Sequence, residues 1–256
     1  MNNFFSIFIF AVVITLNISA QTVAFKNVNV IPMDKEQVLP NQTVLVRDGI
    51  IAEIGSKIKL PKDAKVIDGK GKYLIPGLVD MHAHLLSDEK FPDSLAPDEL
   101  KIMLANGITT VRIMIGTPEH LVLRKQSANQ EIIAPTLYVA SPQLSGRSFG
   151  DPFNGYVVTN ETQAREAVRQ AKQAGYDFIK LTFFITRSVY DAVIDEAAKQ
   201  NIRVIGHVDR QVGLARVFEA KQQIEHLDGF FEAMIPSSAN LPGSTSGVYV
   251  WQAKAW

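Results

Sequence analysis

Residues 75–84 read IPGLVDMHAH, and this stretch decides the fold. An apolar run that ends in a His-x-His pair is typical of a buried strand with polar residues at its carboxyl end. His82 and His84 are two positions apart, so in a strand they share one face and can point at the same inner position. Asp80 has the same parity. The stretch therefore predicts a buried strand that ends in candidate functional residues.

After residue 74 the sequence alternates between strand-like and helix-like segments as far as about residue 227. This alternation indicates α/β organisation with parallel strands. The expected strands are 75–82, 110–114, 137–140, 178–182, 203–207 and 223–227. The expected helices are 98–105, 118–126, 161–174, 188–200 and 211–220. Roughly thirty residues per unit fits an eightfold barrel of about 250 residues, although an open doubly wound sheet fits the same counts.

The segment before this alternation, residues 21–74, has a different sequence pattern, without helix-like stretches. Short alternating runs at 28–31, 43–46, 50–54 and 65–67 predict strands, and Asp48-Gly49 predicts a hairpin turn. Together they indicate a small antiparallel sheet, whose open edges require packing against another part of the protein.

The amino terminus predicts export. Residues 4–16 are apolar except for Ser6 and Thr15, and small residues lead up to Ala20. The run is too short to cross a hydrocarbon core of about 30 Å comfortably. We therefore expect a signal peptide over residues 1–20 and a secreted or periplasmic protein, without stable membrane association after cleavage. The first three residues lack Lys and Arg, so an uncleaved anchor is the alternative.

The composition excludes several classes of function. The 256 residues include 26 basic and 26 acidic side chains, so the formal net charge is zero and nucleic acid is a poor partner. The chain has no cysteine, which excludes disulfides, thiolate metal ligands and a cysteine nucleophile. Acidic membrane surfaces are equally poor partners, and the composition leaves a homo-oligomer open.

Five histidines are the main candidates for chemistry. Four of them, His82, His84, His207 and His226, are expected at the carboxyl ends of strands, which is where active sites form in parallel barrels. A lone histidine at such a position is more often a satisfied polar residue, but four together weaken that interpretation. His120 falls within an expected helix next to an acidic residue, and we expect it to be a solvated surface side chain.

Lys180 is unusual because it interrupts an apolar run, Phe-Ile-Lys-Leu-Thr, at residues 178–182. In a central strand its ammonium would be buried and would need a partner carboxylate or would lose its charge. A neutral buried lysine can react with carbon dioxide to form a carbamate, whose two oxygens can bridge two metal ions. A lysine that reaches past the strand end to solvent is the alternative.

These residues carry a resemblance. The segments are PGLVDMHAH at 76–84, GITTVR at 107–112, IKL at 179–181, GHV at 206–208 and IEHL at 224–227. In order and spacing the set resembles the metal-dependent amidohydrolase superfamily, and within it the imidazolonepropionase-like or prolidase-like branch. The segment 21–74 is similar to the small β-sandwich of these enzymes, and residues 75–256 to their barrel.

The resemblance implies an incomplete (β/α)8 TIM barrel of about six strand-helix units. It implies two divalent ions, expected to be zinc, with His82 and His84 on the more buried ion and His207 and His226 on the outer one. Carboxylated Lys180 would bridge the two ions. The implied reaction is hydrolysis of an amide, cyclic amide or dipeptide-like bond by a metal-bridging hydroxide.

The chain also departs from the superfamily. The aspartate that serves as general base in such enzymes is expected beyond residue 256, so we expect a fragment with doubtful activity of its own. The alternatives are a degenerate, non-catalytic metal-binding relative and an ester, lactone or phosphotriester hydrolase on the same scaffold. Glu225 and Asp228 flank His226, and strand alternation predicts that they face outward, in supporting or surface roles rather than as ligands.

Substrate choice is expected to depend on loops at the carboxyl ends of the strands. The longest such loop is 141–160, which we interpret as a lid or specificity loop. Arg147 within it is a candidate for binding a substrate carboxylate, although a solvated loop arginine is the commoner case.

Overall fold

The structure is a computed structural model that describes residues 22–85, 95–148 and 155–234. The chain divides into two compact units, residues 1–76 and 77–256. The expected signal peptide at 1–20 lies outside the described residues. Among the residues described, we find no helix with the length and apolar character needed to cross a membrane.

The first unit is a five-stranded sheet. It contains β1 (Thr22–Val30), β2 (Leu39–Arg47), β3 (Ile50–Gly55), β4 (Lys65–Asp68) and β5 (Tyr73–Leu74). The order of the strands is β3-β2-β1-β4. The short strand β5 also pairs with β1, at the carboxyl end of β1 after the residues that pair with β4. The expectation of an antiparallel sheet is correct for β1, β2 and β3 but wrong for β4 and β5, which run parallel to β1. The β2–β3 hairpin has positive φ at Asp48 (52°) and Gly49 (75°), as a tight Asp-Gly turn requires.

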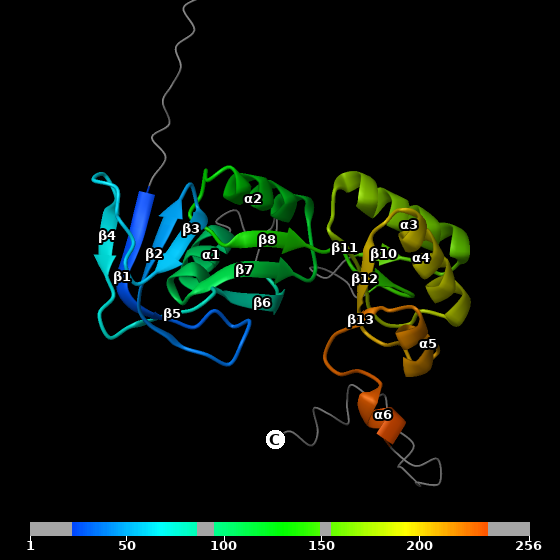
Figure 1. Cartoon of the computed structure of the whole chain (residues 1–256). Helices are drawn as coiled ribbons and strands as arrows, with labels where there is room; N and C mark the ends of the chain where they lie inside the picture. The colour runs from blue at the N-terminus through cyan, green and yellow to red at the C-terminus, as the bar shows by residue number, and fades with distance from the viewer. Residues whose placement is uncertain (1–21, 86–94, 149–154, 235–256) are drawn as a thin grey trace, which may run out of the picture. The chain divides into compact units, whose positions relative to one another are not determined.

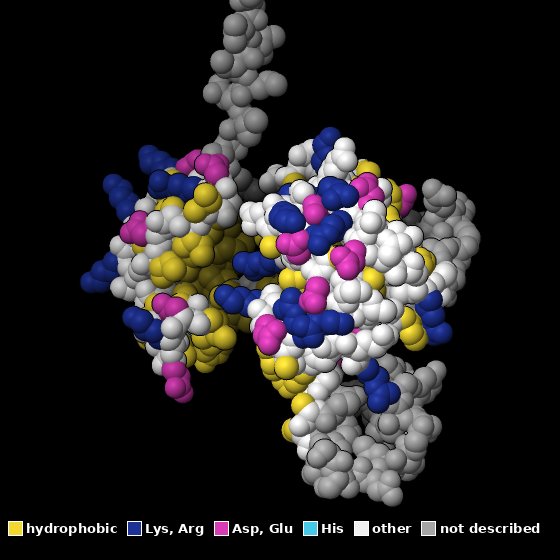
Figure 2. All heavy atoms as spheres, turned by 90° about the vertical axis from the view of Figure 1, so that its right-hand side faces the viewer, with side chains coloured by type: hydrophobic (Ala, Val, Ile, Leu, Met, Phe, Trp, Pro, Cys, Tyr) yellow, Lys and Arg dark blue, Asp and Glu magenta, His cyan; other side chains and the backbone are white. Residues whose placement is uncertain are grey.

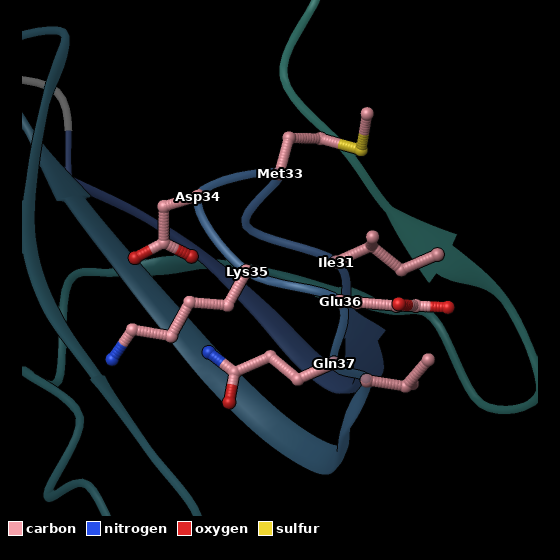
Figure 3. A pocket seen from close by; sticks show the side chains of 7 residues that line it. Ile31, Met33, Asp34, Lys35, Glu36 and Gln37 are labelled. Atoms are coloured by element: carbon pink, nitrogen blue, oxygen red, sulfur yellow. The ribbon is translucent and has the colours of Figure 1, made fainter.

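A hollow in this unit is formed by the segment between β1 and β2 alone. Its lining residues run from Ile31 to Val38. Figure 3 shows that the labelled side chains, including Asp34 and Lys35, do not converge on one point. The hollow therefore has the character of a surface loop rather than of a binding site.

The second unit has two groups of parallel strands. The first is β6 (Leu78–Ala83), β7 (Ile108–Ile113) and β8 (Thr136–Val139). The second, in the order β10-β9-β11-β12-β13, contains β9 (Leu144–Ser145), β10 (Tyr156–Val157), β11 (Phe178–Leu181), β12 (Arg203–Gly206) and β13 (Gln223–Ile224). A single bridge between Ala140 and Phe178 joins the groups. The predicted α/β organisation is confirmed, and the strands described here form no closed barrel.

Helices connect these strands. They are α1 (Ala96–Ala105), α2 (Pro118–Ala128), α3 (Glu161–Ala174), α4 (Arg187–Lys199), α5 (Leu214–Glu219) and α6 (Phe230–Met234). Side chains of Thr117, Asn160 and Thr186 accept backbone N–H groups at the starts of α2, α3 and α4. α3 and α4 lie side by side (Figure 1), and basic and acidic side chains alternate on the face seen in Figure 2. Arg165 pairs there with Asp195 across the two helices.

Strand alternation divides the side chains of the second unit between two environments. Ile113, Ile179 and Val204 join the large core that packs against the helices. Their neighbours with the opposite parity, Phe178 and Ile205, join a smaller cluster with Met114 and Ala140. Arg112 and Lys180 have this second parity and are 2% and 1% exposed. The alternation therefore buries two basic side chains away from the helices.

The structure corrects three local expectations. The loop 141–160 contains the short strands β9 and β10, so part of it belongs to the sheet. Helix α5 starts at Leu214 rather than at 211, because Asp209 Oδ1 accepts the Gln211 N–H (2.8 Å) and holds a turn there. The last strand ends at Ile224 rather than at 227, because His226 and Leu227 adopt left-handed conformations with φ of 61° and 58°.

The expectation that His120 is solvated is wrong. Its side chain is 1% exposed and belongs to the start of α2. The backbone N–H of Thr117 donates to His120 Nδ1 (3.1 Å), and Thr117 Oγ1 accepts the His120 N–H (3.4 Å). His120 thus takes the place of the Glu or Gln in a capping box, which accounts for its burial.

Candidate metal centre

The structure brings four of the five histidines together. His82 lies on β6, His84 follows that strand, His207 follows β12, and His226 follows β13. The ring centroid of His82 lies 5.1 Å from that of His84 and 4.4 Å from that of His226. His226 in turn stacks on His207, at 4.8 Å and 18°. His120 is not part of this cluster.

Backbone geometry places each of these rings. Asp80 Oδ1 accepts the His82 N–H (2.9 Å) and fixes the strand end. Gly206 has φ of 131°, and a Cβ there would lie 2.1 Å from the Leu181 carbonyl oxygen. Only glycine permits this approach of β12 to β11, and His207 is the next residue. His226 itself adopts a left-handed conformation, and its ring lies against those of His82 and His207.

Two carboxylates contact the histidines. Glu225 Oε2 lies 2.9 Å from His82 Nδ1, and Asp228 Oδ2 lies 2.6 Å from His207 Nδ1. The prediction that both carboxylates face outward is wrong, because strand alternation stops at Ile224. A supporting role, which we preferred to direct ligation, fits these contacts.

Arg112 is a functional candidate that the sequence reasoning missed. It lies on β7 and donates to Glu225 Oε1 at 2.5 Å. The signal that singles out Lys180, a charged residue at an inward strand position, also applies to Arg112 in the segment GITTVR. The structure thus adds a buried ion pair beside the histidines.

Lys180 lies on β11, with 1% of its surface exposed. Its Nζ is buried, and nothing within the described residues forms a hydrogen bond with it. Burial lowers the pKa of Lys180 to about 8, and the charge of Arg112 adds to this, while Glu225 and Asp228 oppose it. The alternative of a lysine that reaches solvent is therefore wrong.

The positive charges of the cluster also act on the histidines. Burial lowers the pKa of His84 to about 4, with contributions from His82, Lys180 and His226. Burial likewise lowers the pKa of His226, together with the charges of His207, His82 and Lys180. Both rings are therefore neutral at pH 7, which is the form that binds metal ions.

The donor set fits a divalent metal in part. His82 Nε2 and His84 Nε2 lie 3.2 Å apart. Two nitrogens bound to one tetrahedral zinc at 2.0–2.1 Å lie about 3.3 Å apart, so the pair is spaced as two ligands of one ion. The unpaired, buried Lys180 amine is close enough to His84 and His226 to act electrostatically on both rings. In the described residues no three His, Asp or Glu side chains surround a single point as a complete site would require.

Aromatic side chains border the cluster at the end of β11. The Phe183 ring lies 4.2 Å from the His207 ring, and the Arg147 guanidinium lies 3.6 Å above the Phe184 ring. Arg147, the candidate within loop 141–160 for binding a substrate carboxylate, therefore stacks on an aromatic face.

Comparison with known proteins identifies the family. A model described as the amidohydrolase family matches residues 73–243, so this chain belongs to that family. The chain is 28% identical over 219 residues to an enamidase of Eubacterium barkeri, covering 83% of this chain and 48% of that protein.

Solved structures support the same fold. A putative prolidase of Bifidobacterium longum matches with a TM-score of 0.69 and 24% identity, over 78% of this chain and 52% of that one. A bottromycin amidohydrolase matches with a TM-score of 0.67 and 27% identity, over 87% of this chain and 46% of that one. The fold is thus TIM-barrel-like, and the resemblance to the amidohydrolases is confirmed.

The chain spans about half the length of these relatives. The activity of the whole protein therefore belongs to the proposal that follows, as do the substrate and the number and identity of the metal ions.

Proposed function

We propose that this chain holds the metal centre of a hydrolase that cleaves an amide, cyclic amide or dipeptide-like bond in a small molecule or short peptide. In this proposal two divalent ions, zinc in the first instance, are held by five residues. They are His82, His84, Lys180, His207 and His226.

The observation that carries the proposal is the unpaired, buried amine of Lys180. A lowered pKa makes the neutral amine accessible near neutral pH. The neutral amine can add to carbon dioxide, with loss of a proton, to give a carbamate with one negative charge. The carbamate replaces an uncompensated cation with two oxygens that suit zinc, which turns an unfavourable buried group into a ligand.

The side chains around the ligands have roles of their own. When bound, the metal ions would polarise the substrate carbonyl and make water nucleophilic near neutral pH. Glu225 and Asp228 hold the Nδ1 side of His82 and His207. Phe183 covers one side of the His207 ring and limits the access of water there. A residue that accepts the proton of the attacking water is not assigned within this chain.

The test compares Lys180→Ala with Lys199→Ala, which removes an exposed lysine from α4. Bound metal per chain is the first readout, because it does not depend on turnover. We expect about two ions per chain in the wild type and in Lys199→Ala, and loss of most metal in Lys180→Ala. Unchanged metal content in Lys180→Ala would refute the role of this residue as a ligand.

A second readout separates the types of reaction. Dipeptides and cyclic amides are compared with ester, lactone and phosphotriester substrates under the same conditions. Preferential turnover of the carbon–nitrogen substrates supports the proposal, and preferential turnover of the other panel contradicts it. Metal binding without turnover of either panel fits both a fragment that lacks its general base and the degenerate, non-catalytic alternative, and it contradicts hydrolysis by this chain alone.

We also propose that the protein is exported. The apolar segment that ends at Ala20 supports this. Amino-terminal sequencing of protein recovered from an expressing cell tests it. A mature chain that begins at Gln21 in the exported fraction is the expected result, and an intact amino terminus in the cytoplasmic fraction contradicts it.

A further inference from the structure

A buried chain of hydrogen bonds leads from Arg112 to His82. Arg112 Nε donates to the Met81 carbonyl oxygen (2.7 Å), and Nη1 donates to Gln223 Oε1 (2.7 Å). Arg112 Nη2 donates to Glu225 Oε1 at 2.5 Å. The other oxygen of this carboxylate, Oε2, lies 2.9 Å from His82 Nδ1. One carboxylate group thus receives a guanidinium on one side and an imidazole on the other.

We propose that Arg112 and Glu225 are a positioning pair that sets the ring orientation and the tautomer of His82. The inference rests on the proposed function, which makes His82 a metal ligand. Arginine offers only donors, and a carboxylate paired with it offers only lone pairs. His82 Nδ1 must then carry the ring proton, which leaves the lone pair on Nε2. This is the nitrogen that faces His84.

The same contacts also link β7 to β13, which is a structural role. A variant at Gln223 can distinguish this structural role from the positioning of His82. Gln223 accepts from the same guanidinium as Glu225. Among the described residues, no hydrogen bond joins Gln223 to His82. Gln223→Leu therefore removes part of the link between strands and leaves the carboxylate in place. A purely structural role predicts that Gln223→Leu and Glu225→Gln behave alike.

Glu225→Gln gives a sharper expectation. The amide has one oxygen and one NH2 group, and Arg112 can only donate, so the oxygen must turn toward Arg112. The NH2 group then faces His82 Nδ1, which has to accept. The ring proton moves to Nε2 and blocks the nitrogen that faces His84. In the double variant Arg112→Met, Glu225→Gln, the amide can turn around and its oxygen can again accept from Nδ1.

The experiment reads the His82 tautomer by 15N NMR of the imidazole nitrogens, in the full, metal-free chain at a pH where the ring is neutral. We expect the Nδ1–H form in the wild type, in Gln223→Leu and in the double variant, and the Nε2–H form in Glu225→Gln. Zinc affinity, measured by competition with a chelator, should fall about 10–100-fold in Glu225→Gln. In Gln223→Leu we expect it to change by less than about threefold, because no supporting carboxylate is lost.

Two results would overturn the proposal. One is an Nε2–H tautomer in the wild-type chain, a reading that needs no variant to fold. The other is a change in tautomer and zinc affinity in Gln223→Leu as large as in Glu225→Gln. If the wild type shows the expected tautomer pattern but binds no zinc, the proposed function fails while the positioning pair stands.

Discussion

Replacement of His120 should change how the stability of the second unit depends on pH. The His120 side chain is 1% exposed, and its Nδ1 accepts the Thr117 N–H at 3.1 Å. A protonated imidazole has no acceptor, so this bond requires the neutral ring. Burial lowers the pKa of His120 from 6.5 to about 4, although Glu119 and a hydrogen bond with the Leu85 backbone oppose the shift.

The direction of the effect follows from the two pKa values. The unfolded chain takes up the proton near pH 6.5, whereas the folded chain takes it up only near pH 4. Between these values the unfolded state binds more protons, so acidification lowers the free energy of unfolding. A difference of about 2.5 units at 1.36 kcal/mol per unit gives a loss of about 3 kcal/mol. Above about pH 7 His120 is neutral in both states, so its titration no longer changes the free energy of unfolding.

The assay is urea unfolding of the wild type and of His120→Gln between about pH 7 and about pH 4. Glutamine keeps an acceptor for the Thr117 N–H and does not titrate. We expect the stability of the variant to fall less with acid, by about 3 kcal/mol over the window, and the Thr117 amide to stay protected from hydrogen exchange. Lys125→Gln, an exposed change in the same helix that does not act on the His120 pKa, is the control. Parallel curves for the wild type and His120→Gln would refute the reasoning.

Three further predictions concern the sheet. Lys180→Met should raise the stability of the metal-free chain at pH 7 by up to about 3 kcal/mol, because it removes a buried ammonium. This gain in stability should shrink as the pH rises from about 8 toward 10.5, because the wild-type amine then becomes neutral in both the folded and the unfolded state. Urea unfolding measures the gain, and a variant less stable than the wild type at pH 7 would contradict the prediction. Gly206→Ala should cost more than about 2 kcal/mol and weaken zinc binding, because its Cβ would meet the Leu181 oxygen; wild-type values in both assays would exclude this clash. Asp177→Ala should cost about 2–3 kcal/mol, since Asp177 accepts the Val139 N–H at 2.7 Å and pairs with an arginine of α2. Hydrogen exchange at Val139 checks it, and a protected amide in the variant would count against it.

Period-two alternation explains what the sequence could predict of the site. His82, Lys180 and His207 lie in or directly after regular strands, so their inward direction follows from strand parity. The buried lysine was recognisable because a charged residue interrupts an apolar run. The same signal is present at Arg112, a charged residue at an inward position of β7.

Backbone conformation accounts for what the sequence could not predict. His226 and Leu227 have positive φ, yet neither is Gly or Asn, so nothing in their identity signals a left-handed turn. This turn ends the strand alternation, and Glu225 and Asp228 on either side of it contact His82 and His207. His120 was misjudged for a related reason, because capping boxes are recognised by Glu or Gln and here a histidine fills that position.

Under the proposed function, the spacing of the histidines along the chain determines when a metal ion could first bind during synthesis. His82 and His84 are separated by one residue and can chelate an ion in a nascent chain, whereas His207 and His226 arrive only after β12 and β13 have joined the sheet. Parallel pairings between distant segments form slowly. An ion held early also binds the unfolded state, which reduces the stability that it adds to the native state. We therefore expect refolding without metal, followed by its addition, to recover more native protein than refolding with metal present throughout.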